Sequence, residues 1–69
     1  GLFNDLNAKE NLMLLNSFDD KKISEEDICT AIKSVGLDYE SKLPYKKFSL
    51  GMKQKLCIAQ AIMSHPDIL

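Results

Sequence analysis

The stretch from residue 48 to residue 63 constrains the fold of this chain more than any other. Four apolar residues recur there at helical spacing and predict one buried stripe on an amphipathic helix: Met52, Leu56, Ala59 and Met63. Ser49 stands before the stripe as a candidate N-cap, and Gly51 removes a side chain that would shield the first amides. No carboxylate neutralises the positive end of the helix dipole there. The pattern predicts a helix from about Leu50 to Ser64 whose bare start suits an anion, most often a phosphate.

Two earlier stretches also have helical character. Asn7 and Glu10 form a capping-box pattern, and the helix that follows is predicted to run to about Phe18 with an apolar side made by Ala8, Leu12 and Leu15. Ser24 caps the next helix, whose first turn carries three acids and whose buried stripe is predicted to be Ile28, Ala31, Ile32 and Val35. Gly36 occupies the position that usually ends a helix. The predicted fold is therefore mainly α, with three helices.

Length and composition limit the class of protein. With 69 residues, the chain forms at most one small domain. It has no apolar run long enough to span a bilayer and no signal-peptide pattern. Cys29 and Cys57 fall on apolar helical positions without a metal-site spacing, which favours reduced cysteines in an intracellular protein. The apolar start at Leu2 and the apolar end at 67–69, which is typical of a strand that has been cut, make both ends look like cuts through a larger domain.

The net charge of −1 is unevenly distributed. Residues 41–66 contain five lysines and no acid, whereas the other residues contain four lysines and ten acids. One interpretation is a cationic surface around the bare helix start, and the other is a solvated lysine face. The Ser and the Gly at the same place favour the first interpretation.

Two motifs in this chain resemble those of one family. F-S-L-G-M-K-Q-K-L-C-I-A-Q-A-I, at residues 48–62, resembles the signature motif of ABC transporter ATPases, L-S-G-G-Q, and the helix that follows it. Residues 2–12 are similar to the stretch that follows the Q-loop in this family, of the type L-(Y/F)-x-x-L-T-(A/V)-x-E-N-L. Residues 65–69 look like the segment that leads into the Walker B strand. The resemblance identifies residues 1–69 as part of an ABC ATPase domain, the helical subdomain excised from the α/β core, with its signature motif at 48–52.

The resemblance also implies a binding role for the start of the third helix. In the family, the signature motif of one subunit contacts the γ-phosphate of ATP bound to the partner subunit. Carried over, the Ser49 hydroxyl and the amides of Leu50 and Gly51 donate to phosphate, and Met52 completes the nucleotide-binding set. Met52 stands where the family usually has Gln, and Leu50 where it usually has the first Gly. This form of the motif resembles a branch found among exporters of antibiotics and antimicrobial peptides.

Several parts of an ABC ATPase are missing from the sequence. It contains no G-x-x-x-x-G-K-[S/T], no Walker B Asp and no Glu to orient water, and His65 does not match the family's switch His. We therefore expect no catalytic and no metal-ligating residue here, so that the chain alone does not hydrolyse ATP although its parent protein does. ATP with Mg²⁺ belongs to the parent, and neither is expected to bind tightly to this chain.

The resemblance implies two partners and a location. The partners are a second nucleotide-binding domain, in a homo- or heterodimer, and a transmembrane permease subunit that docks on the region of residues 2–15. The location is cytoplasmic, peripheral to the cell membrane through the permease.

Two other functions are compatible with the sequence. The first is a three-helix nucleic-acid-binding module with its lysine-rich third helix in a groove. The long connection between the second and third helices and the absence of arginine both speak against it, so no nucleic-acid partner is expected. The second is a plain protein-interaction module in which the motif is coincidental.

Overall fold

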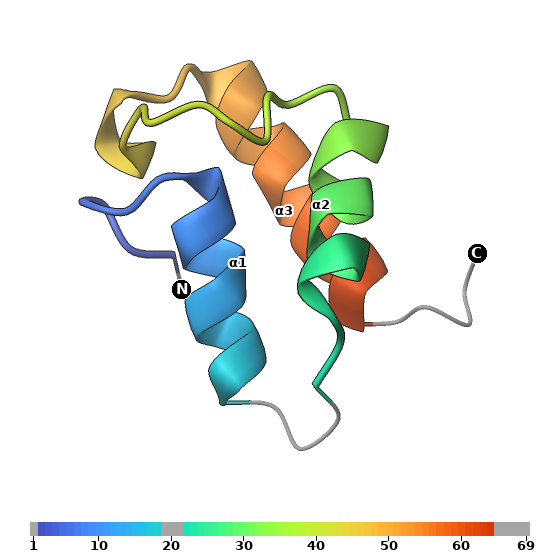
Figure 1. Ribbon diagram of the computed structural model, residues 1–69. Helices are drawn as coiled ribbons and strands as arrows, with labels where there is room; N and C mark the ends of the chain where they lie inside the picture. The colour runs from blue at the N-terminus through green and yellow to red at the C-terminus, as the bar shows by residue number, and fades with distance from the viewer. Residues whose placement is uncertain (1, 19–21, 65–69) are drawn as a thin grey trace.

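A computed structural model of the chain describes residues 2–18 and 22–64, and in these residues it contains three α-helices and no strand. The helices are α1 (Ala8–Ser17), α2 (Glu25–Ser34) and α3 (Leu50–Ser64), with a short 3₁₀ turn, η1 (Tyr45–Lys47), before α3 (Figure 1). The prediction of a mainly α, three-helix fold is confirmed. The predicted strand-like end at 67–69 and the turn containing His65 lie outside the described residues, as does most of the polar connection after Phe18.

The first two helices begin where their capping residues predict. At α1 the Glu10 N–H donates to Asn7 Oδ1 at 2.8 Å, and the Asn7 N–H donates to Glu10 Oε1 at 3.0 Å. At α2 the Asp27 N–H donates to Ser24 Oγ at 3.1 Å. Each capping residue therefore satisfies first-turn amides that have no partner inside their helix.

The end of α2 depends on a glycine. Gly36 has a φ of 85°, in the left-handed region that residues with a Cβ rarely adopt. With this geometry the Gly36 N–H reaches the carbonyl of Lys33 at 3.0 Å, and the Leu37 N–H reaches that of Ile32 at 3.2 Å. Two carbonyls of the last turn of α2 thus have hydrogen-bond partners, and the chain reverses direction so that Leu37 is buried in the core.

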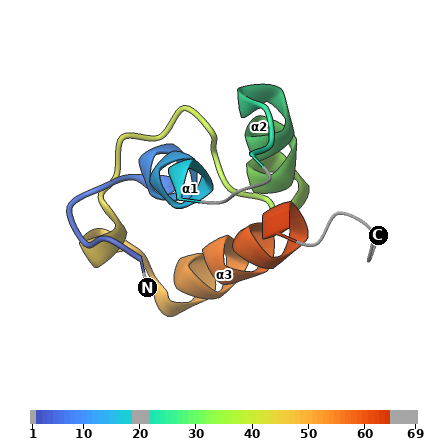
Figure 2. The same ribbon diagram turned by 90° about the horizontal axis from the view of Figure 1, so that it is seen from below.

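The core lies where α2 packs against both α1 and α3. In Figure 2 α1 and α2 are seen almost end-on, and α3 runs across beneath them. The buried apolar residues come from all three helices and from the connection before α3: Ala8, Leu12, Ile28, Ala31, Ile32, Leu37, Phe48, Leu56, Ala59 and Met63. Val35 and Met52, at the ends of the predicted stripes, are only partly buried.

The connection between α2 and α3 contains an element without a clear signal in the sequence. The η1 turn is held against the N-terminal segment, because the Tyr45 N–H donates to the Leu6 carbonyl and the Lys46 N–H to that of Asn4, both at 2.9 Å. The N-terminal segment is a turn, closed by the Leu6 N–H and the Phe3 carbonyl at 3.3 Å. We call residues 3–6 the N-terminal turn.

The remaining sequence expectations concern membrane spans and cysteines. No helix in the described part of the chain is long and apolar enough to cross a membrane. Cys29 and Cys57 are both free thiols. Cys57 is exposed and Cys29 half-buried, so neither belongs to the buried core.

Candidate anion site at the start of α3

The start of α3 has the cap that the sequence predicts. The Met52 N–H donates to Ser49 Oγ at 3.1 Å, and the Lys53 N–H donates to the Ser49 carbonyl at 3.0 Å. The Ser49 hydroxyl accepts in the first of these bonds, so its own proton is free to donate to a further group. Ser49 thus fixes the helix start and still offers a donor.

Two amides at this helix start have no hydrogen-bond partner in the part of the chain that the structure describes. In residues 2–18 and 22–64 no hydrogen bond is donated by the N–H of Leu50 or of Gly51. Both residues are exposed, and a Cβ built on Gly51 would meet only Ser49 Oγ, at 4.0 Å. The first turn of α3 contains no acid. Free N–H groups, open space and an uncompensated dipole are the combination that favours an anion at a helix start.

The four residues predicted to contact nucleotide are not equally placed. Ser49, Leu50 and Gly51 are exposed side by side, with 73% of the Leu50 surface accessible. Met52 is partly buried against the core, and its amide is already bonded to Ser49. Three of the four therefore face the open end of α3, and Met52 is a packing residue here.

Three of the five lysines of residues 41–66 have neighbours of their own. Lys46 Nζ pairs with Asp5 Oδ1 at 3.1 Å, and Lys53 Nζ lies 5.2 Å from the centre of the Tyr45 ring. Lys55 Nζ lies near Gly36, 3.9 Å from the position that a Cβ would take there. The positive potential that the geometry directs at the site is that of the α3 backbone, whose first turn carries no acid.

The residue before the cap anchors the site to the body of the molecule. Phe48 is buried in the core, and its ring lies 5.3 Å from that of Tyr45, measured between centroids. Its N–H donates to the Tyr45 carbonyl at 2.9 Å. Because Phe48 is fixed by η1 on one side and by the core on the other, Ser49 follows at a defined position.

Sequence reasoning missed Asn11, the side chain that makes the most hydrogen bonds among the described residues. Asn11 is fully buried, and its amide makes hydrogen bonds to the backbone of Phe3, Leu6 and Asn7. A signal was present in the sequence. Asn11 lies three residues after Ala8 and directly before Leu12, so that a polar residue occupies the apolar face of the predicted helix.

A second polar cluster joins α1 to α2 and lies apart from the helix start of α3. Lys9 Nζ is 3.7 Å from Glu25 Oε2 and 5.1 Å from the Tyr39 ring centre, while the Tyr39 hydroxyl donates to Glu25 Oε2 at 3.3 Å. Tyr39 and then Glu25 raise the pKa of Lys9 above its ordinary value. Desolvation of the hydroxyl and then the Glu25 charge raise the pKa of Tyr39. With both pKa values raised, Lys9 stays charged and Tyr39 stays neutral near pH 7, and the cluster acts as a structural tie between α1 and α2.

The described residues also form one groove, of about 420 Å³, between α2 and the last turn of α3. Its lining is mostly apolar and consists of Ile23, Asp27, Thr30, Ala31, Ser34, Ile62 and Met63. No group of three or more metal-ligating side chains occurs in residues 2–18 and 22–64.

Comparison with known families gives a match over the whole chain. The model of the ABC transporter family matches residues 1–69. No solved structure matches the chain significantly.

Several curated proteins are similar to this chain. An uncharacterised ABC transporter ATP-binding protein, YybJ of Bacillus subtilis (strain 168), is 51% identical over 63 residues, which cover 90% of this chain and 28% of that protein. The bacitracin transport ATP-binding protein BcrA of Bacillus licheniformis is 41% identical over 69 residues, covering 100% of this chain and 22% of BcrA. The lantibiotic transport ATP-binding protein SrtF of Streptococcus pyogenes is 37% identical over 68 residues, which cover 99% of this chain and 29% of SrtF. The chain thus spans between about a fifth and a third of the length of these relatives.

Proposed function

The chain belongs to the ABC transporter family. On that premise we propose that residues 1–69 form the helical, signature-bearing part of the ATPase domain of an ATP-binding subunit. Its contribution is a phosphate contact made in trans, at the start of α3, to ATP bound by a second nucleotide-binding domain. The observation that carries the proposal is the pair of unpaired amides at Leu50 and Gly51 within the motif at 48–52.

The residues at this helix start suit a phosphate group. The N–H groups of Leu50 and Gly51 and the free proton of the Ser49 hydroxyl are three donors at one end of a helix dipole. Charge-assisted hydrogen bonds to a phosphate oxygen are shorter and stronger than neutral ones. Bound ATP supplies the phosphoryl group, and Mg²⁺ is held by other parts of the parent protein. Ser49, Leu50 and Gly51 hold the γ-phosphate and compensate its charge.

The open geometry at Gly51 is part of the proposal. A side chain at this position would stand where the phosphate approaches the helix, while no side chain of the described residues fills that space. Leu50, largely exposed, provides an apolar contact at the same edge, available to the facing domain. Met52 supports the site from the core side through its packing and its amide bond to Ser49.

We infer the transported class and the other partners from the relatives. The names of BcrA and SrtF assign them to bacitracin and lantibiotic transport, so export of antibiotics or antimicrobial peptides is the proposed task of the whole protein. The partners are then a second ATP-binding domain and a transmembrane permease, which the region of residues 2–15 contacts. Such an assembly holds this subunit at the cytoplasmic face of the membrane.

Gly51→Trp in the full-length protein that contains this chain tests the phosphate contact. We expect ATP-driven dimerisation and ATPase activity to be lost while the fold is kept, because Gly51 is exposed and a Cβ there meets no packed atom. Glu26→Trp is the matched control, since Glu26 is the exposed second residue of α2 as Gly51 is of α3. Sedimentation with and without ATP, together with ATPase rates, gives the result. Unchanged ATP-driven dimerisation in Gly51→Trp would overturn the proposal.

A further inference from the structure

Asn11 lies on α1, far from the α3 start in sequence. Its side chain is fully buried, a state that costs free energy unless every polar atom is bonded. Asn11 Oδ1 accepts from the Phe3 N–H at 2.6 Å, and the two protons of Nδ2 are shared among the carbonyls of Phe3, Leu6 and Asn7, each 3.1 Å from the nitrogen. The oxygen faces an N–H and the nitrogen faces carbonyls, so the surroundings fit a single orientation of the amide. One side chain therefore fixes the backbone of the N-terminal turn.

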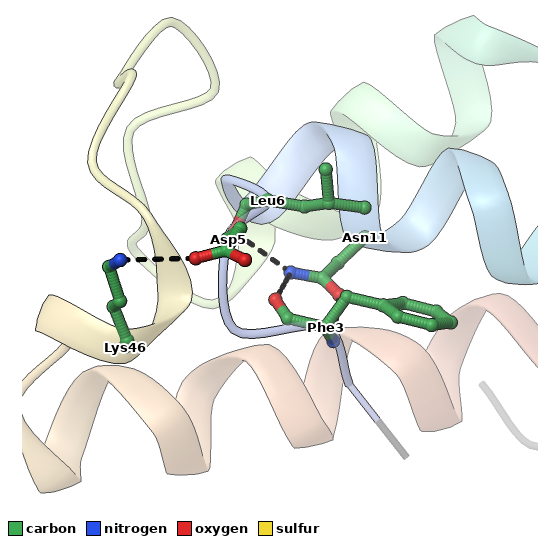
Figure 3. Close-up of polar contacts among 5 residues, drawn as sticks. All are labelled: Phe3, Asp5, Leu6, Asn11 and Lys46. Atoms are coloured by element: carbon green, nitrogen blue, oxygen red, sulfur yellow. Dashed lines mark hydrogen bonds and ion pairs between the residues drawn. The ribbon is translucent and has the colours of Figure 1, made fainter.

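The N-terminal turn in turn fixes η1. The Leu6 carbonyl accepts from Asn11 Nδ2 and also from the Tyr45 N–H, at 2.9 Å, so this oxygen is shared by α1 and η1. Next to it, the Lys46 N–H donates to the Asn4 carbonyl at 2.9 Å, and the Lys46 side chain pairs with Asp5 (Figure 3). Two backbone bonds and one ion pair thus hold η1 against a turn whose position Asn11 sets.

From η1 the contacts continue to the α3 start. The Tyr45 carbonyl accepts from the Phe48 N–H, the Tyr45 ring packs against the Phe48 ring, and Lys53 of α3 lies over the same tyrosine. Phe48 is the residue before the Ser49 cap. A shift of the N-terminal turn therefore moves the entry of α3, because the contacts from the turn through Tyr45 to Phe48 are continuous.

We propose that Asn11 is a positioning residue for the phosphate contact of Ser49 and Gly51, acting through the N-terminal turn and η1. This inference rests on the proposed function of the α3 start. Loss of the Asn11 amide frees the turn, lets η1 shift, and moves the amides of Leu50 and Gly51 away from the phosphate. The effect is on the geometry of the α3 start and not only on the stability of the fold.

The chain offers a matched control on the same helix. Asn16 near the end of α1 also holds a neighbouring segment by its amide, because Asn16 Oδ1 accepts from the Ile23 N–H at 3.0 Å and Nδ2 donates to the Ile23 carbonyl at 2.9 Å. Ile23 precedes α2, away from η1. Asn11→Ala and Asn16→Ala both remove bonds between a side chain and the backbone, but only the first lies on the route to Ser49.

The first experiment compares these two variants in the full-length protein that contains this chain, below the unfolding temperature of each. For Asn11→Ala we expect the ATP concentration for half-maximal dimerisation to rise about tenfold, and for Asn16→Ala less than about twofold. Hydrogen exchange of the peptide covering residues 48–52 should accelerate in Asn11→Ala alone. Equal ATP requirements and equal exchange in the two variants would overturn the inference.

A second pair of variants avoids the buried position, in case Asn11→Ala does not fold. Tyr45→Pro deletes the N–H that binds the Leu6 carbonyl, and it is locally compatible because Pro44 has an extended backbone and Tyr45 is the first residue of η1. Tyr45→Ala loses the same ring but keeps the N–H. We expect the ATP requirement to be several times higher in Tyr45→Pro than in Tyr45→Ala, and equal values would overturn the inference. If Gly51→Trp leaves dimerisation intact, the proposed function fails; if Gly51→Trp abolishes it and these pairs do not differ, only the positioning role fails.

Discussion

The starts of α2 and α3 have the same cap and opposite electrostatics. In both, a serine side chain accepts from the N–H three residues later, at 3.1 Å: Ser24 from Asp27 and Ser49 from Met52. The first turn of α2 carries Glu25, Glu26 and Asp27, whereas that of α3 carries no acid. The dipole of α2 is therefore compensated by its own side chains, and that of α3 is left for another charge.

The difference shows that a capped helix start is not by itself a binding site. Capping satisfies local amides and fixes where a helix begins, and α2 uses it for that purpose alone. At α3 the missing acids and the open space over Gly51 are additional features, and both cost helix stability. A feature that lowers local stability without serving the packing of the core is best explained by function.

Leu50→Glu would remove this difference, and we expect it to affect ATP-driven dimerisation more than removal of either capping serine. The added carboxylate compensates the dipole and should stabilise the fold by about 0.3–1 kcal/mol, since Leu50 is 73% exposed and its loss costs little packing. The same charge repels a phosphate, and we expect ATP-driven dimerisation to need about thirtyfold more ATP. Thermal unfolding and ATP titration measure the two effects.

Leu50→Gln is the control for this change, because it has nearly the same shape without the charge. It should leave the ATP requirement within about threefold of that of the original protein. If Leu50→Gln and Leu50→Glu weaken dimerisation equally, the loss comes from the leucine contact, and the electrostatic contrast between α2 and α3 has no functional meaning.

Removing the two capping serines tests the feature that the helix starts share. Ser24→Ala and Ser49→Ala should each destabilise the fold by about 1 kcal/mol, measured by denaturant unfolding. Ser49→Ala should in addition raise the ATP requirement several-fold, since it removes a proposed phosphate donor, whereas Ser24→Ala should not. An equal response to ATP in the two variants would indicate that Ser49 is only a cap.

The smallest expected effect concerns the pH dependence of stability and involves Glu25, an acid in the first turn of α2. Glu25 contacts Lys9 and Tyr39, and the folded-state pKa of Lys9 lies above its ordinary 10.5, and that of Tyr39 above its ordinary 10.0. For a pKa raised by folding, the stabilisation is complete below the unfolded-state value and is lost as the pH rises through the folded-state value. Both groups should therefore reduce stability above about pH 10.

Glu25→Gln should make this alkaline loss shallower, since it removes one of the causes that raise each pKa. Glu26→Gln is the control: it removes an equal charge from the same turn but lies outside the Lys9 and Tyr39 contacts. Urea midpoints between pH 7 and pH 11 measure the effect. If the urea midpoint falls equally steeply with pH in both variants, the first-turn acids act only through the helix dipole.

The helices were predictable because their signals are local. Asn7, Ser24, Ser49 and Gly36 each act on residues within four positions, and the helix starts and ends lie at or within a residue of where these residues predict. The bare start of α3 was predictable for the same reason, as the absence of acids is a property of one turn.

The support of the site was not predictable, because it depends on contacts between distant residues. The Tyr45 and Lys46 N–H groups bind carbonyls near the other end of the sequence, and a carbonyl has no side-chain signature. No local pattern therefore predicts the N-terminal turn, or η1 within the long connection between the second and third helices. Of the residues that support the site, only Asn11 has a signal in the sequence, because it is a polar residue on the apolar face of a predicted helix.

The N-terminal turn keeps its path through main-chain groups, which every residue type provides. Asn11 and η1 bind its carbonyls and one N–H, and Asp5 adds an ion pair with Lys46, while the side chains of Phe3 and Asn4 are exposed. The residue type at positions 3 and 4 can therefore change without changing the path of the turn. A lineage of such proteins can exchange these exposed residues to meet different neighbours, and the scaffold that aligns α3 stays the same.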